Sequence, residues 1–209
     1  MQLVMTTGMA YLVDDDAALR DAIPWLLRSR GIPCHTWESA EAFLADYSDE
    51  MSGCLILDLR MGGMTGSELH ERLLERGCAM PVIFLTGHGD VPLAVKALKR
   101  GAFDFIEKPF NDNELADRVH EALQHEQNRR WQDGMKAAVL ERLATLTERE
   151  REVMERILAG KLNKVIADEL SIAMRTVEVH RAHIFEKMGV RSAVELAQRL
   201  SLLGPPGSR

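Results

Sequence analysis

Two patterns of hydrophobic positions alternate along the first half of the chain. Short runs of consecutive apolar residues are separated by longer stretches in which apolar residues recur at helical spacing. Short continuous apolar runs are typical of parallel strands that are buried on both faces. The predicted strands are Tyr11 to Val13, Pro33 to Trp37, Cys54 to Asp58, Val82 to Thr86 and Phe103 to Ile106. The pattern therefore predicts an α/β fold, a (βα)5 doubly wound parallel sheet.

The stretches between these runs predict the helices that cover the sheet. Several of them end at a glycine, the residue that most readily adopts the left-handed conformation after a helix. The predicted helices are Ala17 to Arg30, a helix opened by Ser39, Ser67 to Arg76, Asp90 to Arg100, and a fifth that starts near Asp112 and continues beyond the sheet.

After the fifth strand the sequence becomes helical and polar over a long distance. Residues 124–133 contain almost no apolar side chain except Trp131. We therefore predict three parts: a first domain at 9–123, a helical linker at 124–143 and a second domain at 144–209.

The second domain has the pattern of a small all-α fold. Thr147, followed three residues later by Glu150, is a capping box that starts a helix. Two further helices, Asn163 to Leu170 and about Arg175 to Met188, are separated by a tight turn, and a last helix spans about Ser192 to Leu202. Two short helices joined in this way predict a helix-turn-helix whose outer face is free to enter a DNA major groove.

Polar residues of different kinds follow the strands of the first domain. The predicted strand ends carry Asp14-Asp15-Asp16, Asp58, Thr86 and Lys108. The carboxyl ends of parallel strands lie at one edge of a sheet, where ligands bind. Clustered carboxylates repel one another unless a cation lies between them, and oxygen-only ligands favour Mg²⁺. A lysine and a hydroxyl can hold the oxygens of a phosphoryl group while a carboxylate attacks its phosphorus, so the pattern predicts a phosphoryl-transfer site.

The composition is that of a folded protein. Charged residues make up 28% and hydrophobic residues 46% of the 209 positions. No apolar run approaches the ~20 residues needed to cross a bilayer. Residues 1–10 lack the basic start and long apolar segment of a signal peptide, so we expect a cytoplasmic protein with no membrane partner. The three cysteines are not spaced as a metal knuckle, which predicts buried reduced thiols.

The net charge of −6 is unevenly divided between the two halves. Residues 1–144 carry 15 Lys/Arg against 23 Asp/Glu, a balance of −8, whereas residues 145–209 carry 11 against 9, a balance of +2. The second half is therefore the better suited to a polyanion, although a balance of +2 is weak support for nucleic-acid binding.

Together these motifs resemble a known family. The chain resembles a two-component response regulator of the NarL/FixJ type, in which a receiver domain precedes a LuxR-type helix-turn-helix domain. The resemblance extends from about Met9 to Leu200 and rests on the order and spacing of the motifs. They are Val13-Asp14-Asp15-Asp16, Leu57 to Met61, Leu85-Thr86-Gly87, Lys108-Pro109-Phe110, Leu146 to Glu150 and Thr176 to Ala182.

The resemblance implies roles for the residues at the strand ends. Asp58 matches the aspartate that accepts the phosphoryl group, and Asp14 and Asp15 match the acidic pair. The expected direct ligands of Mg²⁺ are Asp15, Asp58 and the backbone carbonyl of Arg60. Asp14 completes the expected metal site.

Three further residues match the switch of a receiver domain. Thr86 matches the switch hydroxyl, Lys108 the phosphoryl-binding lysine, and Phe105 the aromatic residue that changes rotamer when the threonine moves. In the resembled fold, the peptide bond between Lys108 and Pro109 is expected to be cis.

The chain departs from the family pattern at two positions. Gly62 stands where the family usually has proline, which should loosen the loop after Asp58 without touching the chemistry. Ala173 stands where the family usually has a serine or threonine that caps the recognition helix, a cap worth ~1 kcal/mol. We expect that cap to be missing or to be supplied by Ser171.

The matched helix-turn-helix also implies a set of DNA contacts. Basic residues on or near the recognition helix would contact phosphates, while Glu178 can accept a hydrogen bond from cytosine and Val179 or Ala182 can contact a thymine methyl group. The predicted DNA-binding residues are Lys164, Met174, Arg175, Thr176, Glu178, Val179, Arg181, Ala182, Lys187 and Arg191.

Simpler interpretations exist for several of these residues. Asp14-Asp15-Asp16 can be a solvated run at a helix start, where carboxylates favour the helix dipole. Phe105 can be a core aromatic residue, and His88 can be either a neighbour of the phosphoryl pocket or merely exposed. His180 has the spacing of an inner face, which favours a packed, hydrogen-bonded histidine over a base reader. The basic residues of the recognition helix can be ordinary solvated charges.

We therefore predict a DNA-binding transcriptional response regulator that is not an enzyme. A sensor histidine kinase would phosphorylate Asp58 with Mg²⁺ as cofactor, and the phosphorylated chain would form a homodimer, bind double-stranded promoter DNA and contact RNA polymerase. The alternative is a metal-dependent aspartyl-phosphate phosphatase or phosphotransferase. That class usually carries an acid two residues after the nucleophile, where this chain has Arg60. A receiver that acts as a constitutive interaction module without phosphorylation is a third possibility, against which the intact acidic set argues.

Overall fold

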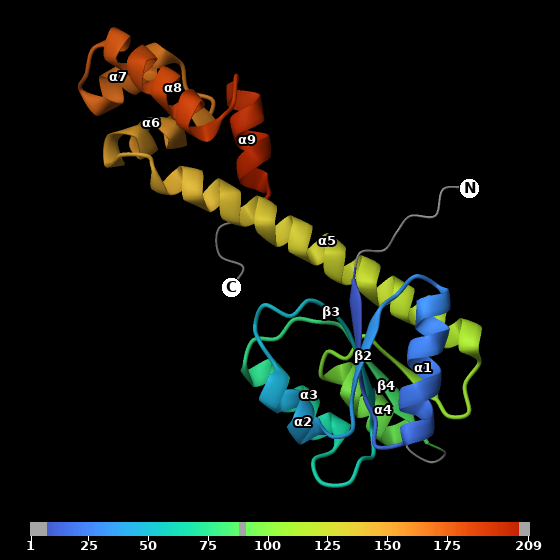
Figure 1. Ribbon diagram of the computed structural model, residues 1–209. Helices are drawn as coiled ribbons and strands as arrows, with labels where there is room; N and C mark the ends of the chain where they lie inside the picture. The colour runs from blue at the N-terminus through green and yellow to red at the C-terminus, as the bar shows by residue number, and fades with distance from the viewer. Residues whose placement is uncertain (1–7, 88–90, 205–209) are drawn as a thin grey trace. The chain divides into compact units, whose positions relative to one another are not determined.

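The computed structural model describes residues 8–87 and 91–204 (Figure 1). The chain divides into two compact units, Met1–Arg129 and Arg130–Arg209. Helix α5, Asp112–Ala144, begins in the first unit and ends in the second.

The first unit is a five-stranded parallel sheet in the order β2-β1-β3-β4-β5. Its strands are β1 Met9–Val13, β2 Cys34–Trp37, β3 Gly53–Asp58, β4 Val82–Thr86 and β5 Asp104–Glu107. Its helices are α1 Ala17–Ser29, α2 Ala40–Asp46, α3 Gly66–Glu75, α4 Val91–Lys99 and the first part of α5. This arrangement confirms the predicted doubly wound α/β fold.

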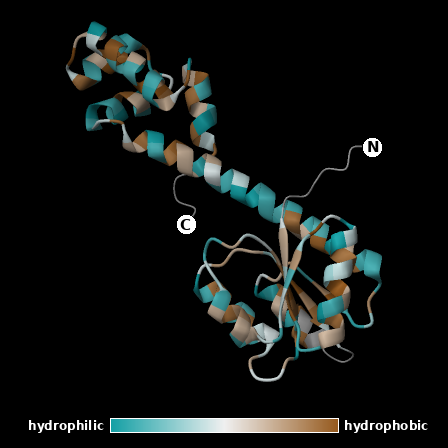
Figure 2. Cartoon of the chain, in the orientation of Figure 1, coloured by the Kyte–Doolittle hydropathy of each residue, from teal (hydrophilic) through white to brown (hydrophobic). Residues whose placement is uncertain are grey.

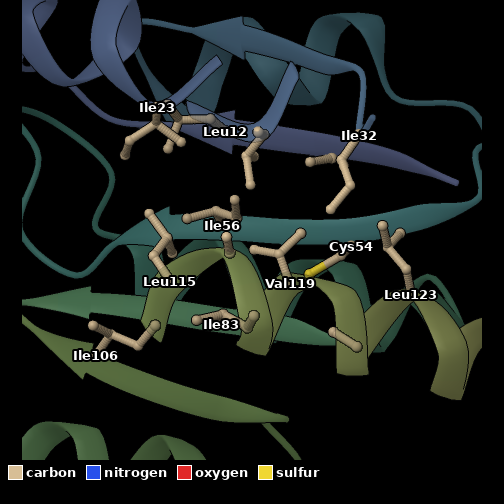
Figure 3. Packing of buried hydrophobic residues seen from close by; sticks show 14 of the residues in the cluster. Leu12, Ile23, Ile32, Cys54, Ile56, Ile83, Ile106, Leu115, Val119 and Leu123 are labelled. Atoms are coloured by element: carbon tan, nitrogen blue, oxygen red, sulfur yellow. The ribbon is translucent and has the colours of Figure 1, made fainter. Parts of the chain in front are cut away.

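Helices cover both faces of this sheet. Residues of α1 and α5 form one hydrophobic cluster with alternate residues of the strands, and residues of α2, α3 and α4 form a second cluster on the other face. Figure 3 shows the first cluster, with Leu115, Val119 and Leu123 of α5 against the strand residues. Because both faces are covered, the central strands are apolar at successive positions, as the apolar colour of their ribbons in Figure 2 shows.

The second unit is all helical. Its helices after α5 are α6 Glu148–Leu158, α7 Asn163–Leu170, α8 Met174–Met188 and α9 Ala193–Ser201. The capping box predicted at the start of α6 is present, with Thr147 and Glu150 bonded reciprocally. Val177, Ile184 and Met188 are fully buried in a core that also includes Val139 of α5.

The stretch predicted as a helical linker, residues 124–143, lies within α5. Near its start, Glu126 is 3% exposed and makes two hydrogen bonds of 2.9 and 2.8 Å with Arg129. Near its end, Val139 is 3% exposed. Both ends of the stretch are therefore packed into the unit to which they belong. No helix within the described ranges is long and apolar enough to cross a membrane.

Several boundaries differ from the predicted ones by one or two residues. Strand β1 begins at Met9 rather than Tyr11, and α3 begins at Gly66 because Thr65 caps it through a capping box with Glu68. The predicted start of the fourth helix, Asp90, lies outside the described residues. Cys54 is buried, but Cys34 and Cys78 are only half-buried, so the prediction of buried thiols applies fully to Cys54 alone.

Candidate functional site

Three carboxylates meet at the carboxyl edge of the sheet. Asp14 follows β1 and is fully buried, Asp58 ends β3 and is 8% exposed, and Asp15 is exposed. One carboxylate oxygen from each lies within 4.8 Å of the others. The sequence placed these residues at strand ends, and the parallel order of β1 and β3 brings them together. An oxygen-only set of this kind fits Mg²⁺.

Lys108 brings a positive charge to the same edge from the end of β5. Its Nζ lies 2.8 Å from Asp14 Oδ2 and 3.3 Å from Asp58 Oδ2. The backbone N–H of Lys108 donates to the carbonyl of Thr86 at 2.6 Å, which ties the lysine to the end of β4. The peptide bond from Lys108 to Pro109 is cis, as expected.

The three aspartates after β1 have different environments. Asp14 accepts hydrogen bonds on its carboxylate from the N–H of Asp16 at 2.9 Å and, on its carbonyl, from Arg20 at 2.8 Å. The carboxylate of Asp16 accepts from the N–H of Ala18 at 2.8 Å and caps α1. The helix-start interpretation therefore applies to Asp16, whereas Asp14 and Asp15 belong to the carboxylate cluster.

The charge on Asp58 is stabilised only in part by its surroundings. Burial raises the pKa of its carboxyl group, the neighbouring Lys108 lowers it, and the charge of Asp14 raises it again, with a net rise. The N–H of Arg60 donates to Asp58 Oδ1 at 3.3 Å and favours the ionised form. A nucleophilic carboxylate must be ionised, so an additional cation at this cluster would favour the reactive form.

Two of the predicted switch residues lie on neighbouring strands, Thr86 at the end of β4 and Phe105 in β5. Thr86 is fully buried and its hydroxyl donates to the carbonyl of Ile106 at 3.4 Å. Phe105 is half-buried and packs against the hydrophobic cluster that includes residues of α2, α3 and α4, which agrees with the interpretation of this side chain as a core residue. Of the predicted phosphoryl-binding and switch residues that the structure describes, Lys108 is the one that contacts the carboxylates, through its Nζ. His88 lies outside the described residues.

Sequence reasoning missed two residues that shape the loop after Asp58. A Cβ atom on Gly66 would lie 2.2 Å from the carbonyl oxygen of Asp58, so only glycine fits there. Glu41 of α2 accepts a hydrogen bond from the N–H of Met64 at 2.9 Å and anchors the loop. The need for glycine at position 66 depends on the path of the backbone, and the role of Glu41 depends on a contact with a residue 23 positions away. No local sequence signal could therefore have identified either residue.

The outer surface of α8 is open to solvent, as a recognition helix requires. Met174 is 52% and Val179 48% exposed. The other predicted contacts that are exposed are Lys164, Arg175, Thr176, Glu178, Ala182 and Arg191. Arg181 is half-buried, with its guanidinium carbon 5.4 Å from the centre of the Phe185 ring.

The turn before α8 lacks a side-chain cap. Ala173 occupies the N-cap position of α8 and no side chain caps the helix. Ser171 ends α7 in the left-handed conformation, with a φ of 53°. The missing cap is therefore confirmed, and the alternative that Ser171 supplies it is wrong. His180 is half-buried, in keeping with a packed side chain.

Comparison with known proteins decides the family. Residues 10–120 match the response regulator receiver domain, and residues 144–200 match the bacterial regulatory proteins of the luxR family. The chain belongs to the response-regulator family. It is a DNA-binding response regulator of a two-component system, and the two matched domains imply a histidine kinase partner and DNA binding. The phosphatase alternative is not favoured, because the matched family consists of transcriptional regulators.

Curated relatives of this response regulator match it over nearly its whole length. The C4-dicarboxylate transport transcriptional regulatory protein DctR of Rhodobacter capsulatus is 50% identical over 90% of this chain and 96% of the relative. The transcriptional regulatory protein FixJ of Bradyrhizobium diazoefficiens is 42% identical over 92% of this chain and 94% of its own.

Solved structures agree with this assignment. The response regulator StyR is 39% identical and superimposes with a TM-score of 0.86, covering 93% of this chain and 98% of StyR. Full-length FixJ from B. japonicum is 40% identical, with a TM-score of 0.61 over 95% of this chain and 98% of its own.

The response regulator also contains a partly buried ion pair in its second unit that the sequence did not predict. Glu150 is 4% exposed, and its Oε2 lies 2.6 Å from Lys187 Nζ of α8. Lys187 also donates to the carbonyl of Thr145 at 3.2 Å, and His183 Nδ1 lies 3.9 Å from Glu150 Oε1. The start of α6 is therefore linked to the recognition helix by a residue that we had expected to contact DNA.

Proposed function

We propose that this response regulator is switched by transfer of a phosphoryl group from its histidine kinase to Asp58. The observation that carries the proposal is the position of Lys108, whose Nζ contacts both Asp14 and Asp58 at the edge of the sheet. A carboxylate oxygen of Asp58 attacks phosphorus, and the bond from phosphorus to the kinase histidine breaks with its electron pair going to the imidazole. Lys108 then neutralises charge on the phosphoryl oxygens.

The expected metal ligands are Asp14, Asp15, Asp58 and the carbonyl of Arg60. Support for Mg²⁺ comes from the donors, which are all oxygen atoms, and from the clustering of three carboxylates, whose mutual repulsion a divalent cation offsets. A bound Mg²⁺ would neutralise charge on the phosphoryl oxygens as they approach Asp58.

Phosphorylation then acts through Thr86. Its hydrogen bond to the carbonyl of Ile106 is long, at 3.4 Å, and is easily exchanged for a stronger bond to a charged phosphoryl oxygen. Movement of Thr86 toward Asp58 leaves space into which Phe105 turns. The result is a change in the surface formed by α4 and β5, which shifts the protein between two states.

We propose that the phosphorylated receiver forms a homodimer and that two recognition helices bind two half-sites of promoter DNA. The proposed contacts are Lys164, Met174, Arg175, Thr176, Glu178, Val179, Arg181, Ala182 and Arg191. Lys187 we assign instead to positioning α8, because its ammonium group is held by Glu150. A cytoplasmic location, a contact with RNA polymerase and the absence of enzymatic activity complete the proposal.

Sedimentation velocity and DNA titration, each with and without a small phosphodonor and Mg²⁺, test this function. The original chain should dimerise and bind promoter DNA more tightly after treatment, while Asp58→Asn should respond in neither assay. A chain that stays monomeric and binds DNA with unchanged affinity after stoichiometric phosphorylation would contradict the proposed switch.

A further inference from the structure

The exposed carboxylate of the cluster is held by the backbone of the loop after β3. The N–H of Gly62 donates to Asp15 Oδ2 at 3.1 Å, although the two residues are 47 positions apart. Asp14 and Asp58 are held differently, because each contacts the ammonium group of Lys108. Asp15 thus depends on a peptide group for its orientation.

We propose that the N–H of Gly62 positions Asp15 to bind the divalent cation. This inference rests on the proposed metal site and adds a positioning residue to it. The hydrogen bond engages one carboxylate oxygen and leaves the other for the cation. It restricts the rotation of an exposed side chain before the cation arrives, so less conformational entropy is lost on binding.

Such a contact should have a large effect on cation affinity. Hydrogen bonds that orient the ligands of a metal ion change its affinity by roughly 10- to 100-fold when they are removed. This differs from the expectation that glycine at this position leaves the chemistry untouched.

The position allows the N–H to be tested apart from the side chain. An added Cβ on Gly62 would meet no atom within 4 Å, and the φ of Gly62 lies outside the left-handed region, so Gly62→Ala keeps the donor without strain. Gly62→Pro removes the donor, because proline has no backbone N–H. Gly63 has a φ of +86°, so Gly63→Ala strains the same loop but keeps the N–H of Gly62.

Calorimetric titration of the full chain with MgCl₂, in the absence of any phosphodonor, tests the proposal. Gly62→Pro should raise the dissociation constant for Mg²⁺ by about 10-fold or more, whereas Gly62→Ala should change it by less than about twofold. Gly63→Ala should weaken binding clearly less than Gly62→Pro. Should Gly62→Pro fail to fold, replacing Gly62 by glycolic acid through nonsense suppression removes the N–H while keeping the backbone geometry.

Two results would overturn the role of Gly62. One is that Gly62→Pro, or the glycolic acid variant when that is used, binds Mg²⁺ as tightly as the original chain does. The other is an equal loss in Gly62→Pro and Gly63→Ala, which would show that loop strain and not the missing donor weakens binding. If the original chain itself binds no Mg²⁺, the metal site fails and the role of Gly62 fails with it.

Discussion

Removal of Lys187 should loosen the packing of the recognition helix. In Lys187→Met, Glu150, which is 4% exposed in the original chain, loses the ammonium group 2.6 Å from its Oε2. Breaking a fully buried ion pair costs about 3–5 kcal/mol. Here the cost is smaller, since the Lys187 side chain is 34% exposed and Glu150 keeps its bonds to Thr147 at 2.8 and 3.1 Å. We expect a loss of about 1–2 kcal/mol.

Hydrogen exchange of the full chain, followed by mass spectrometry on peptides from α6 and α8, measures this loss. A loss of about 1–2 kcal/mol corresponds to exchange that is about 5- to 30-fold faster. Lys161→Met is the matched control, because Lys161 forms a more exposed ion pair with Glu169 and Arg156 remains 3.0 Å from Glu169. The control should change exchange by no more than about twofold. Equal exchange in the two variants would refute the positioning role of Lys187.

The pH dependence of the stability difference between the original chain and Lys187→Met follows from the pKa of Glu150. Burial raises that pKa, but hydrogen bonds from Lys187 and Thr147 outweigh burial, and the net shift is downward. A carboxyl group with a lowered folded pKa contributes stability that is present above its unfolded value of about 4.3 and is lost as the pH falls through the folded value. The stability difference between the original chain and Lys187→Met should therefore shrink below about pH 4.

Three further outcomes are expected. Mg²⁺ should raise the melting temperature of the original chain, and Asp15→Ala should remove most of that increase; equal increases would contradict the metal site. Arg175→Ala should weaken binding to specific and scrambled DNA alike and should reduce the salt dependence of binding. Val179→Ala should weaken binding to specific DNA more than binding to scrambled DNA. Identical losses on both DNAs for the Val179 variant would mean that α8 docks differently. Arg60→Ala should alter the dephosphorylation rate of the acceptor severalfold, and an unchanged decay rate would show that this exposed side chain neither shields the phosphoryl group nor positions water.

The strand-end residues could be predicted because their positions follow from one rule. A buried parallel strand is a continuous apolar run, so the sequence shows where it ends, and the parallel order brings Asp14, Asp58 and Lys108 to one edge. The different roles of Asp14, Asp15 and Asp16 could not be predicted, since adjacent carboxylates have the same local sequence pattern. Only the backbone path after β1 assigns Asp16 to the start of α1 and leaves Asp14 and Asp15 to the cluster.

Contacts between residues that are far apart in the sequence could not be predicted from local sequence patterns. The capping box predicted the bonds between Glu150 and Thr147, which are three residues apart. It gave no sign of Lys187, 37 residues away, because that contact depends on how α8 packs against α6. The hydrogen bond from Gly62 to Asp15 was missed for a similar reason, since glycine was considered for its flexibility and not for its donor.

The central claim is that Asp58 accepts the phosphoryl group, and intact-protein mass spectrometry after incubation with acetyl phosphate and Mg²⁺ tests it most directly. The original chain should gain one phosphate per chain, and hydroxylamine should remove it, as expected of an acyl phosphate. Asp58→Asn, which keeps the shape of the side chain but not its charge, should gain none while melting at a similar temperature without Mg²⁺. Equal labelling of the two proteins would contradict the account.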